Sequence, residues 1–232
     1  MTPEMLLINR TVPVELVIFD CDGVLVDSEG IANRVTSRCI TRLGWPMTPA
    51  EADQHFLGMT LTDMIPVIEA RIRHSVPPGW RAAMMQEFLA DLARNATAIP
   101  GAIAALDGLD SLAMAWRIAS NSSHEEMGVK FSRLALTDRV TGRVHSYRDV
   151  ARGKPAPDVY LAAAAAEGVA PDRCLVIEDS AVGATAAVAA GMVCLGFAPH
   201  DDGDRLVAVG AIPFRSMFDV PHYVSLAQRI AA

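Results

Sequence analysis

Four short apolar runs, at residues 15–20, 115–120, 174–178 and 192–197, constrain the fold of this 232-residue chain more than any other feature. Each run is β-prone and is bounded by turn or cap residues, which is typical of a buried strand. Helical patterns separate the runs. Because strands that alternate with helices build βαβ units, the sequence predicts an α/β fold with a parallel sheet.

Cap residues mark where the intervening helices begin and end. We expect helices near 101–112, from the capping-box pattern at 122–125 onwards, from Pro157 to Gly168, and from Ser180 to Gly191.

Residues 30–98 interrupt this alternation. They show no convincing strand pattern, and helical patterns occur near 30–43, 49–56, 60–74 and 80–94. We therefore expect a catalytic core made of residues 1–29 and 99–232, and an inserted all-helical domain at 30–98. An insert after the first strand would lie above the carboxyl end of that strand, as a lid over the crevice where α/β sheets bind ligands.

The net charge of −7 disfavours nucleic acid or an anionic membrane surface as a partner. An anionic small molecule stays possible, because a bound metal ion can reverse the local field. No apolar stretch reaches membrane-spanning length, and no signal peptide is recognised. The four cysteines form no C-x-x-C pair, so we expect reduced core thiols, a cytoplasmic location, and a monomer or small homo-oligomer.

The first apolar run stops at two acids, Asp20 and Asp22, which Gly23 follows. Such a sequence can be a simple turn in which aspartate side chains bind nearby backbone N–H groups. However, ionised carboxylates at the edge of an apolar core need a charged partner or a metal. The position favours an active site, because open α/β sheets place their sites beyond the carboxyl ends of strands.

Three further polar clusters are predicted to reach the same edge of the sheet. Each has an alternative explanation: Ser120 and Asn121 could cap a helix, Lys154 could be a solvated loop lysine, and Glu178-Asp179 could cap the helix that follows. The conjunction of all four clusters, at predicted strand ends or in adjoining loops of one chain, favours a shared catalytic site.

Phosphoryl transfer is the chemistry that these residues fit. Asp20 is the predicted covalent nucleophile, and Asp22 the predicted acid and base for the leaving oxygen and the attacking water. Lys154 would neutralise the nucleophile and a phosphate oxygen. Ser120, and the backbone amides near Asn121 at a helix N-terminus, would bind other phosphate oxygens.

A divalent cation is predicted beside the nucleophile, because a carboxylate and a phosphate repel one another. Asp20 and Asp179, with Glu178, would hold Mg²⁺, which prefers hard oxygen ligands and retains waters.

The motifs D-x-D-G-V-L-V-D-S-E, S-N, G-K-P-A-P-D and E-D-S-x-x-G, spread over residues 20–183, resemble those of the haloacid dehalogenase superfamily. They are most similar to its capped branch, which includes β-phosphoglucomutase and sugar phosphatases such as 6-phosphogluconate phosphatase. The resemblance implies a Rossmann-like three-layer core, Mg²⁺ as cofactor, and a helical cap that closes over a small phosphorylated metabolite. It also implies that the backbone carbonyl of Asp22 is a metal ligand.

Departures from the family patterns narrow the activity. Dehalogenases lack the second acid of the first motif, which is present here as Asp22. Phosphonatases use a lysine of their cap, and residues 30–98 contain no lysine at all. Ala32 and Leu61 stand where the mutase has histidine and arginine. The expected function is therefore hydrolysis of a sugar or sugar-acid phosphate. Two alternatives stay open, a phosphomutase of the same fold and a catalytically idle module that binds a phosphorylated ligand.

The segment 56–60 resembles the specificity loop of the family cap. The resemblance implies that Gly58 and Met59 contact the substrate, with Gly58 allowing a close backbone approach. A plain turn between two helices is the alternative.

Overall fold

The computed structural model describes residues 2–56 and 59–228. The chain divides into two compact units, residues 1–27 with 98–232, and residues 28–97. The sequence placed these boundaries after residues 29 and 98, a difference of two positions and one position.

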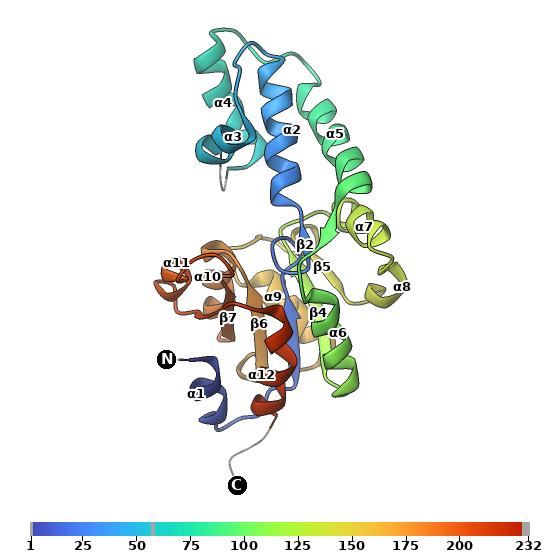
Figure 1. The fold of residues 1–232 in the computed structure, drawn as a ribbon, viewed down its shortest axis with the longest axis vertical. Coiled ribbons are helices and arrows are strands. Elements are labelled where there is room, and N and C mark those ends of the chain that lie inside the picture. The colour runs from blue at the N-terminus through green and yellow to red at the C-terminus, as the bar shows by residue number, and fades with distance from the viewer. Residues whose placement is uncertain (1, 57–58, 229–232) are drawn as a thin grey trace. The chain divides into compact units, whose positions relative to one another are not determined.

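The first unit is built on a six-stranded sheet (Figure 1). Its order is β5-β4-β1-β6-β7-β8, and each neighbouring pair is parallel. The strands are β1 (Leu16–Phe19), β4 (Ala115–Ser120), β5 (Val144–Ser146), β6 (Cys174–Glu178), β7 (Val193–Phe197) and β8 (Ile212–Phe214). Every residue of β1 and β6 is buried, as expected for central parallel strands that are covered on both faces. The predicted α/β fold and its four predicted strands are confirmed.

Helices cover the two faces of this sheet, with α6 and α12 in front and α9 and α10 behind in Figure 1. The helices of the first unit are α1 (Pro3–Ile8), α6 (Ala102–Ser111), α7 (His124–Arg133), α8 (Thr137–Val140), α9 (Asp158–Glu167), α10 (Ala181–Ala189), α11 (Asp204–Val207) and α12 (Val220–Ala227). Single 3-10 turns lie at Tyr147–Asp149, Pro171–Arg173 and Met217–Asp219.

The helix limits follow from local capping, and the capping box of α7 lies one residue later than the predicted 122–125 pattern. Ser123 accepts a hydrogen bond from the backbone of Glu126, whose carboxylate accepts one from the backbone of Ser123, so α7 begins with a capping box. Helix α9 ends at Gly168 in the left-handed conformation. Ser180 caps α10 by accepting a hydrogen bond from the N–H of Gly183.

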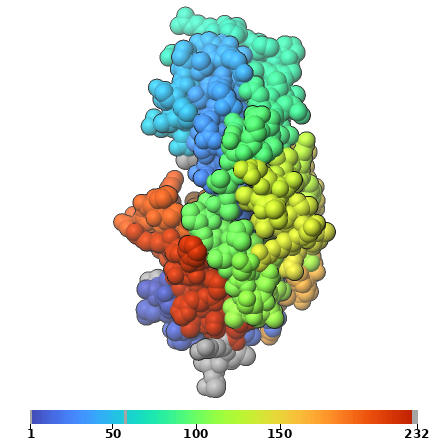
Figure 2. All heavy atoms as spheres, turned by 45° about the vertical axis from the view of Figure 1, so that its right-hand side comes forward, coloured from blue at the N-terminus to red at the C-terminus, as the bar shows by residue number. Residues whose placement is uncertain are grey.

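Small residues let the helices approach closely. Alanines of α9 and α10 pack on Leu16 and Ile18 of β1 in one buried cluster. On the other face, a Cβ added at Gly108 of α6 would lie 2.3 Å from Cγ of Pro221 in α12. In Figure 2, the red C-terminal segment lies directly against the green segment that contains α6.

The second unit consists of α2 (Glu29–Thr41), α3 (Pro49–Phe56), α4 (Leu61–Ile72) and α5 (Trp80–Asn95). These match the four helices predicted for the insert. A salt bridge of 2.8 Å joins Arg38 on α2 to the buried Asp91 on α5.

A two-stranded sheet pairs β2 (Val26–Asp27) with β3 (Thr97–Ala98). We predicted no strand within residues 30–98, and this prediction is wrong at residues 97–98. A strand of two residues is too short to show an alternating pattern in the sequence.

Two strands of the main sheet escaped prediction because they are short and lie at its edges. Both β5 and β8 have three residues and are only partly buried. Pro213 lies inside β8, which an edge strand tolerates because one of its sides has no partner to receive an N–H.

The four cysteines are buried free thiols, in agreement with the prediction. Within residues 2–56 and 59–228, no helix combines the length and apolarity needed to cross a membrane.

Candidate active site

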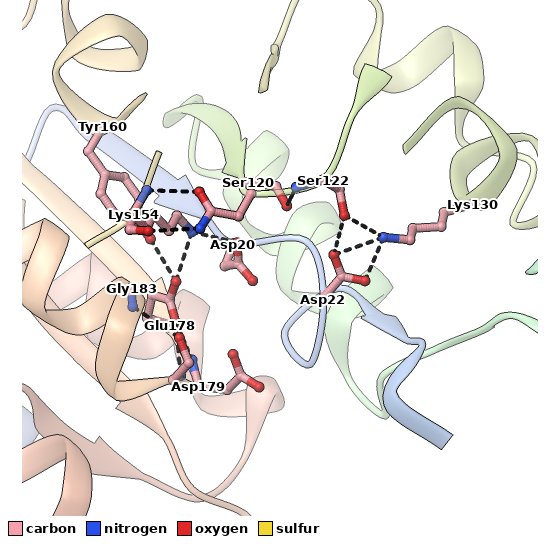
Figure 3. A network of polar contacts seen from close by, with 12 residues as sticks. Asp20, Asp22, Ser120, Ser122, Lys130, Lys154, Tyr160, Glu178, Asp179 and Gly183 are labelled. Carbon is pink, nitrogen blue, oxygen red and sulfur yellow. Dashed lines mark hydrogen bonds and ion pairs between the residues drawn. The ribbon is translucent and has the colours of Figure 1, made fainter. Parts of the chain in front are cut away.

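The strand order brings the predicted clusters to one edge of the sheet. Strand β1 lies between β4 and β6, so their carboxyl ends are neighbours. Asp20 directly follows β1, Ser120 ends β4 and Glu178 ends β6. Figure 3 shows the network of polar contacts at this edge.

Lys154 forms the centre of the first part of the network. Its Nζ lies 2.5 Å from Oδ1 of Asp20 and 2.8 Å from Oε1 of Glu178. It also lies 4.6 Å from the ring centroid of Tyr160, whose hydroxyl donates a hydrogen bond of 3.0 Å to Glu178. All four side chains are buried, so one ammonium serves two carboxylates away from water.

Burial sets the electrostatics of this group. The loss of hydration raises the pKa of Asp20 to about 7, against the attraction of Lys154 and with added repulsion from Glu178. Burial also works to lower the pKa of Lys154, but attraction to Asp20 and Glu178 outweighs it, and the pKa of Lys154 rises. The lysine is therefore a fixed positive charge beside the predicted nucleophile.

Glu178 is held by donors on both oxygens. While Oε1 receives Lys154 and Tyr160, Oε2 accepts hydrogen bonds from the N–H of Asp179 and from the N–H and hydroxyl of Ser180. A Cβ added at Gly183 would lie only 1.5 Å from Oε1 of Glu178. The carboxylate thus occupies the space that the missing side chain of Gly183 leaves.

Three of the predicted metal ligands come together. Asp20, Glu178 and Asp179 each offer one oxygen, and these oxygens lie within 4.8 Å of one another. Gly23, in the left-handed conformation at φ 72°, approaches so closely that a Cβ there would lie 1.8 Å from Oδ2 of Asp179. A compact set of hard carboxylate oxygens has the ligand chemistry that Mg²⁺ prefers.

The two motif residues at the end of β4, Ser120 and Asn121, have different surroundings. Ser120 is 1% exposed, and its Oγ accepts a hydrogen bond of 3.0 Å from the N–H of Ser122. The amide of Asn121 binds the backbone of Lys154 twice, donating to its carbonyl at 3.0 Å and accepting from its N–H at 2.8 Å. The Asn121 side chain therefore fixes the loop that carries Lys154.

Asp22 belongs to a second part of the network. In Figure 3 its carboxylate points toward Lys130 and Ser122 rather than toward Asp20. Nζ of Lys130 lies 2.6 and 2.8 Å from the two carboxylate oxygens, and the hydroxyl of Ser122 donates to Oδ2 at 2.7 Å. The side chain of Asp22 is not one of the three that form the acidic cluster among the described residues.

The predicted cap contacts belong to the second unit. Gly58 lies outside the described residues. Met59 is half-buried, lies two residues before α4, and donates a backbone hydrogen bond of 2.9 Å to the carbonyl of Phe56.

Sequence reasoning missed four polar residues of the network: Ser122, Lys130, Tyr160 and Ser180. One signal was available for Lys130, because it lies three residues after Met127 and directly before Phe131, on the buried stripe of α7. A charged residue at an apolar position of a helix indicates a buried partner. Tyr160 gave no comparable signal, since a tyrosine beside Val159 suits an ordinary core position.

Known proteins resemble this chain in sequence and in fold. The model of the haloacid dehalogenase-like hydrolase family matches residues 14–191. A 6-phosphogluconate phosphatase of Escherichia coli strain K12 is 29% identical over 90% of this chain and 93% of its own length. Hexitol phosphatase A of the same organism is 31% identical over 84% of this chain and 88% of its own.

A solved structure agrees with these matches. A HAD family hydrolase from Deinococcus radiodurans R1, crystallised with bound phosphate and sodium, superposes with a TM-score of 0.78 and is 30% identical. The superposition covers 93% of this chain and 98% of the other.

Proposed function

Because this chain belongs to the haloacid dehalogenase-like hydrolase family, we propose that it is a Mg²⁺-dependent phosphatase of a small phosphorylated metabolite. Phosphoric monoester hydrolysis is the activity that the family match and the named relatives support. Those relatives are named for a sugar-acid phosphate and for hexitols, so the proposed substrate is a sugar, sugar-acid or sugar-alcohol phosphate. The observation that carries the proposal is the buried contact of Lys154 with Asp20 and Glu178, next to Asp179.

Asp20, Glu178 and Asp179 would hold the metal, with the backbone of Asp22 as the further ligand that the family implies. When bound, Mg²⁺ would offset the negative charge that a phosphate brings to this acidic edge. Two like charges 4 Å apart repel by roughly 4 kcal/mol at an effective dielectric of 20, so an acidic site needs such compensation.

In the proposed first step, an oxygen of Asp20 attacks phosphorus and forms an aspartyl-phosphate. The ester P–O bond breaks, and Asp22 gives its proton to the departing alcohol oxygen. Lys154 keeps its charge throughout and balances the negative charge that gathers on the phosphoryl oxygens. Ser120, at the end of β4, would donate a hydrogen bond to one of those oxygens.

In the second step, water attacks phosphorus while Asp22 accepts one of its protons. The bond between Asp20 and phosphorus breaks, and inorganic phosphate leaves. Asp20 returns as a carboxylate and Asp22 as an acid, so the cycle consumes only water.

We further propose that the helical second unit is the cap that determines the substrate. Its residues Ala32 and Leu61 replace the histidine and arginine of the mutase, which favours hydrolysis over isomerisation. The loop near Met59 is the proposed point of substrate contact.

Phosphate release with and without Mg²⁺, over a panel of sugar, sugar-acid and sugar-alcohol phosphates, tests the function. We expect Mg²⁺-dependent release from at least one member, and a loss of more than about 10³-fold in kcat for Asp20→Asn. Asp138→Asn, the same chemical change at an exposed position of α8, is the matched control. Substantial turnover by Asp20→Asn would exclude Asp20 as the nucleophile. Isomerised sugar phosphate that requires a bisphosphate activator would indicate a mutase instead.

A further inference from the structure

The use of lysine in this chain is unusual. Of its 20 lysine and arginine residues, only Lys130 and Lys154 are lysines. Their exposed fractions are 1% and 8%, and each binds one of the two acids at the end of β1. Lys154 has a place in the mechanism proposed above, whereas Lys130 has none.

Lys130, Ser122 and Asp22 all contact one another. Nζ of Lys130 contacts both oxygens of Asp22 and lies 2.8 Å from Oγ of Ser122, which itself donates to Asp22. These three contacts use the three N–H donors of an ammonium. The carboxylate therefore has two donors from different elements, α7 and the segment that follows β4, and its orientation is fixed (Figure 3).

Burying the ammonium of Lys130 costs desolvation free energy. Lys130 lies on the buried face of α7 with Met127 and Phe131, where an apolar side chain would avoid the desolvation of an ammonium. Burial works to lower the pKa of Lys130, but attraction to Asp22 outweighs this effect and raises the pKa, so the residue stays charged. Asp22 itself is one-third exposed, so its charge alone does not require a buried partner.

The same group is joined to the phosphate-binding edge. The N–H of Ser122 donates to Oγ of Ser120, and Ser122 also contacts the carboxylate of Asp22. The residues between β4 and α7 therefore connect the site of the predicted proton donor with the predicted phosphate contact.

We propose that Lys130 is a positioning residue, which acts with Ser122 to hold the carboxylate of Asp22 in place for proton transfer. This inference rests on the proposed function, in which Asp22 serves the leaving oxygen and the attacking water. Its role is distinct from that of Lys154, since Lys130 contacts Asp22 whereas Lys154 contacts Asp20.

The kinetic test uses leaving groups of different acidity. Lys130→Met removes the charge and keeps most of the length of the side chain. For the alkyl phosphate that the panel ranks first, kcat should fall about 10- to 100-fold with little change in KM, as expected when a reacting group is misplaced. For p-nitrophenyl phosphate, whose leaving group needs little protonation, the loss should be several-fold smaller. Arg133→Met, one turn further along α7 at an exposed position, is the matched control.

A double-variant comparison separates positioning from a general loss of structure. If Lys130 acts through Asp22, Lys130→Met should cause little further loss in the Asp22→Asn background. The proposal would be overturned if the two substitutions reduced kcat independently, so that their fold-losses multiplied in the double variant. It would also be overturned if Lys130→Met reduced kcat equally for both leaving groups.

An NMR test needs no turnover, because it observes the lysine side chains directly. Selective labelling of lysine gives only two side-chain signals, since the chain has only two lysines. The Lys130→Met variant assigns them. Asp22→Asn should shift the Lys130 signal strongly, and Asp20→Asn should shift mainly that of Lys154. If neither lysine signal shifts strongly in Asp22→Asn, the pairing is refuted, and this outcome can be read even if Lys130→Met fails to fold and the signals stay unassigned. Absence of any phosphate release by the unaltered protein would instead refute the proposed function on which the role depends.

Discussion

Replacing Gly183 by alanine should destabilise the protein, although alanine is the better helix former. The added Cβ would lie 1.5 Å from Oε1 and 2.0 Å from Cδ of Glu178, so the carboxylate has to move. Displacement breaks a buried ion pair with Lys154 and strains the hydrogen bonds from Tyr160 and Ser180.

The size of the effect follows from opposing contributions. Breaking a buried ion pair costs about 3–5 kcal/mol, while a glycine-to-alanine change inside a helix contributes about 1 kcal/mol of stability. We therefore expect Gly183→Ala to lower the free energy of unfolding by about 2–4 kcal/mol. Turnover should fall as well, because Lys154 loses the anchor that places it against Asp20.

Denaturant unfolding measures this difference, with Gly128→Ala as the control. Gly128 lies in α7, and a Cβ there would meet nothing within 4 Å, so that variant should gain about 0.5–1 kcal/mol. Combining Gly183→Ala with Glu178→Asp should give less than the sum of the single losses, since both disturb the same contacts. If Gly183→Ala proves as stable as Gly128→Ala, the close approach of Glu178 is not what the structure indicates.

Two other predictions concern single hydrogen-bonding side chains. Asn121→Ala removes both contacts with the backbone of Lys154 and should cost about 1–3 kcal/mol in denaturant unfolding and lower phosphate release. Asn121→Asp should restore little of either, because its carboxylate would face the carbonyl of Lys154. Hydrogen bonding from Arg38, with that from Asn95, lowers the pKa of Asp91 below its usual value, so this carboxylate stabilises the second unit fully above about pH 4. That contribution disappears as the pH falls through the lowered pKa. Asp91→Asn should therefore cost about 1–2 kcal/mol at pH 7 and flatten the decline in stability below about pH 4. An unchanged decline would contradict the assignment.

The parts of the fold that sequence predicts are those fixed by local chemistry. The central strands are continuous apolar runs because both faces of a parallel strand are buried. The helix end at Gly168 could be predicted, and the start of α7 to within one residue of the 122–125 pattern, because capping depends on a few adjacent residues. The edge strands β5 and β8 could not, since three partly buried residues leave no periodic signal.

The candidate site divides in the same way. Asp20 and Glu178 could be placed together because each lies at the carboxyl end of a strand, and parallel strands end at one edge of the sheet. The roles of Asn121 and Lys130 could not be predicted, because each depends on a contact with a residue far along the chain. Asp22 shows the limit most clearly, since its neighbour Asp20 points to one cluster while it points to another.

The order of the strands also determines when the protein can first become active. Lys154 reaches Asp20 across 134 positions, and Lys130 reaches Asp22 across 108. A nascent chain whose synthesis stops before β6 would contain Asp20 but neither Glu178 nor Asp179, so its acidic cluster would be incomplete. Such long-range closures are slow steps of folding. Recovery of turnover after dilution from urea would therefore report docking of β6 against β1, rather than the earlier appearance of helices.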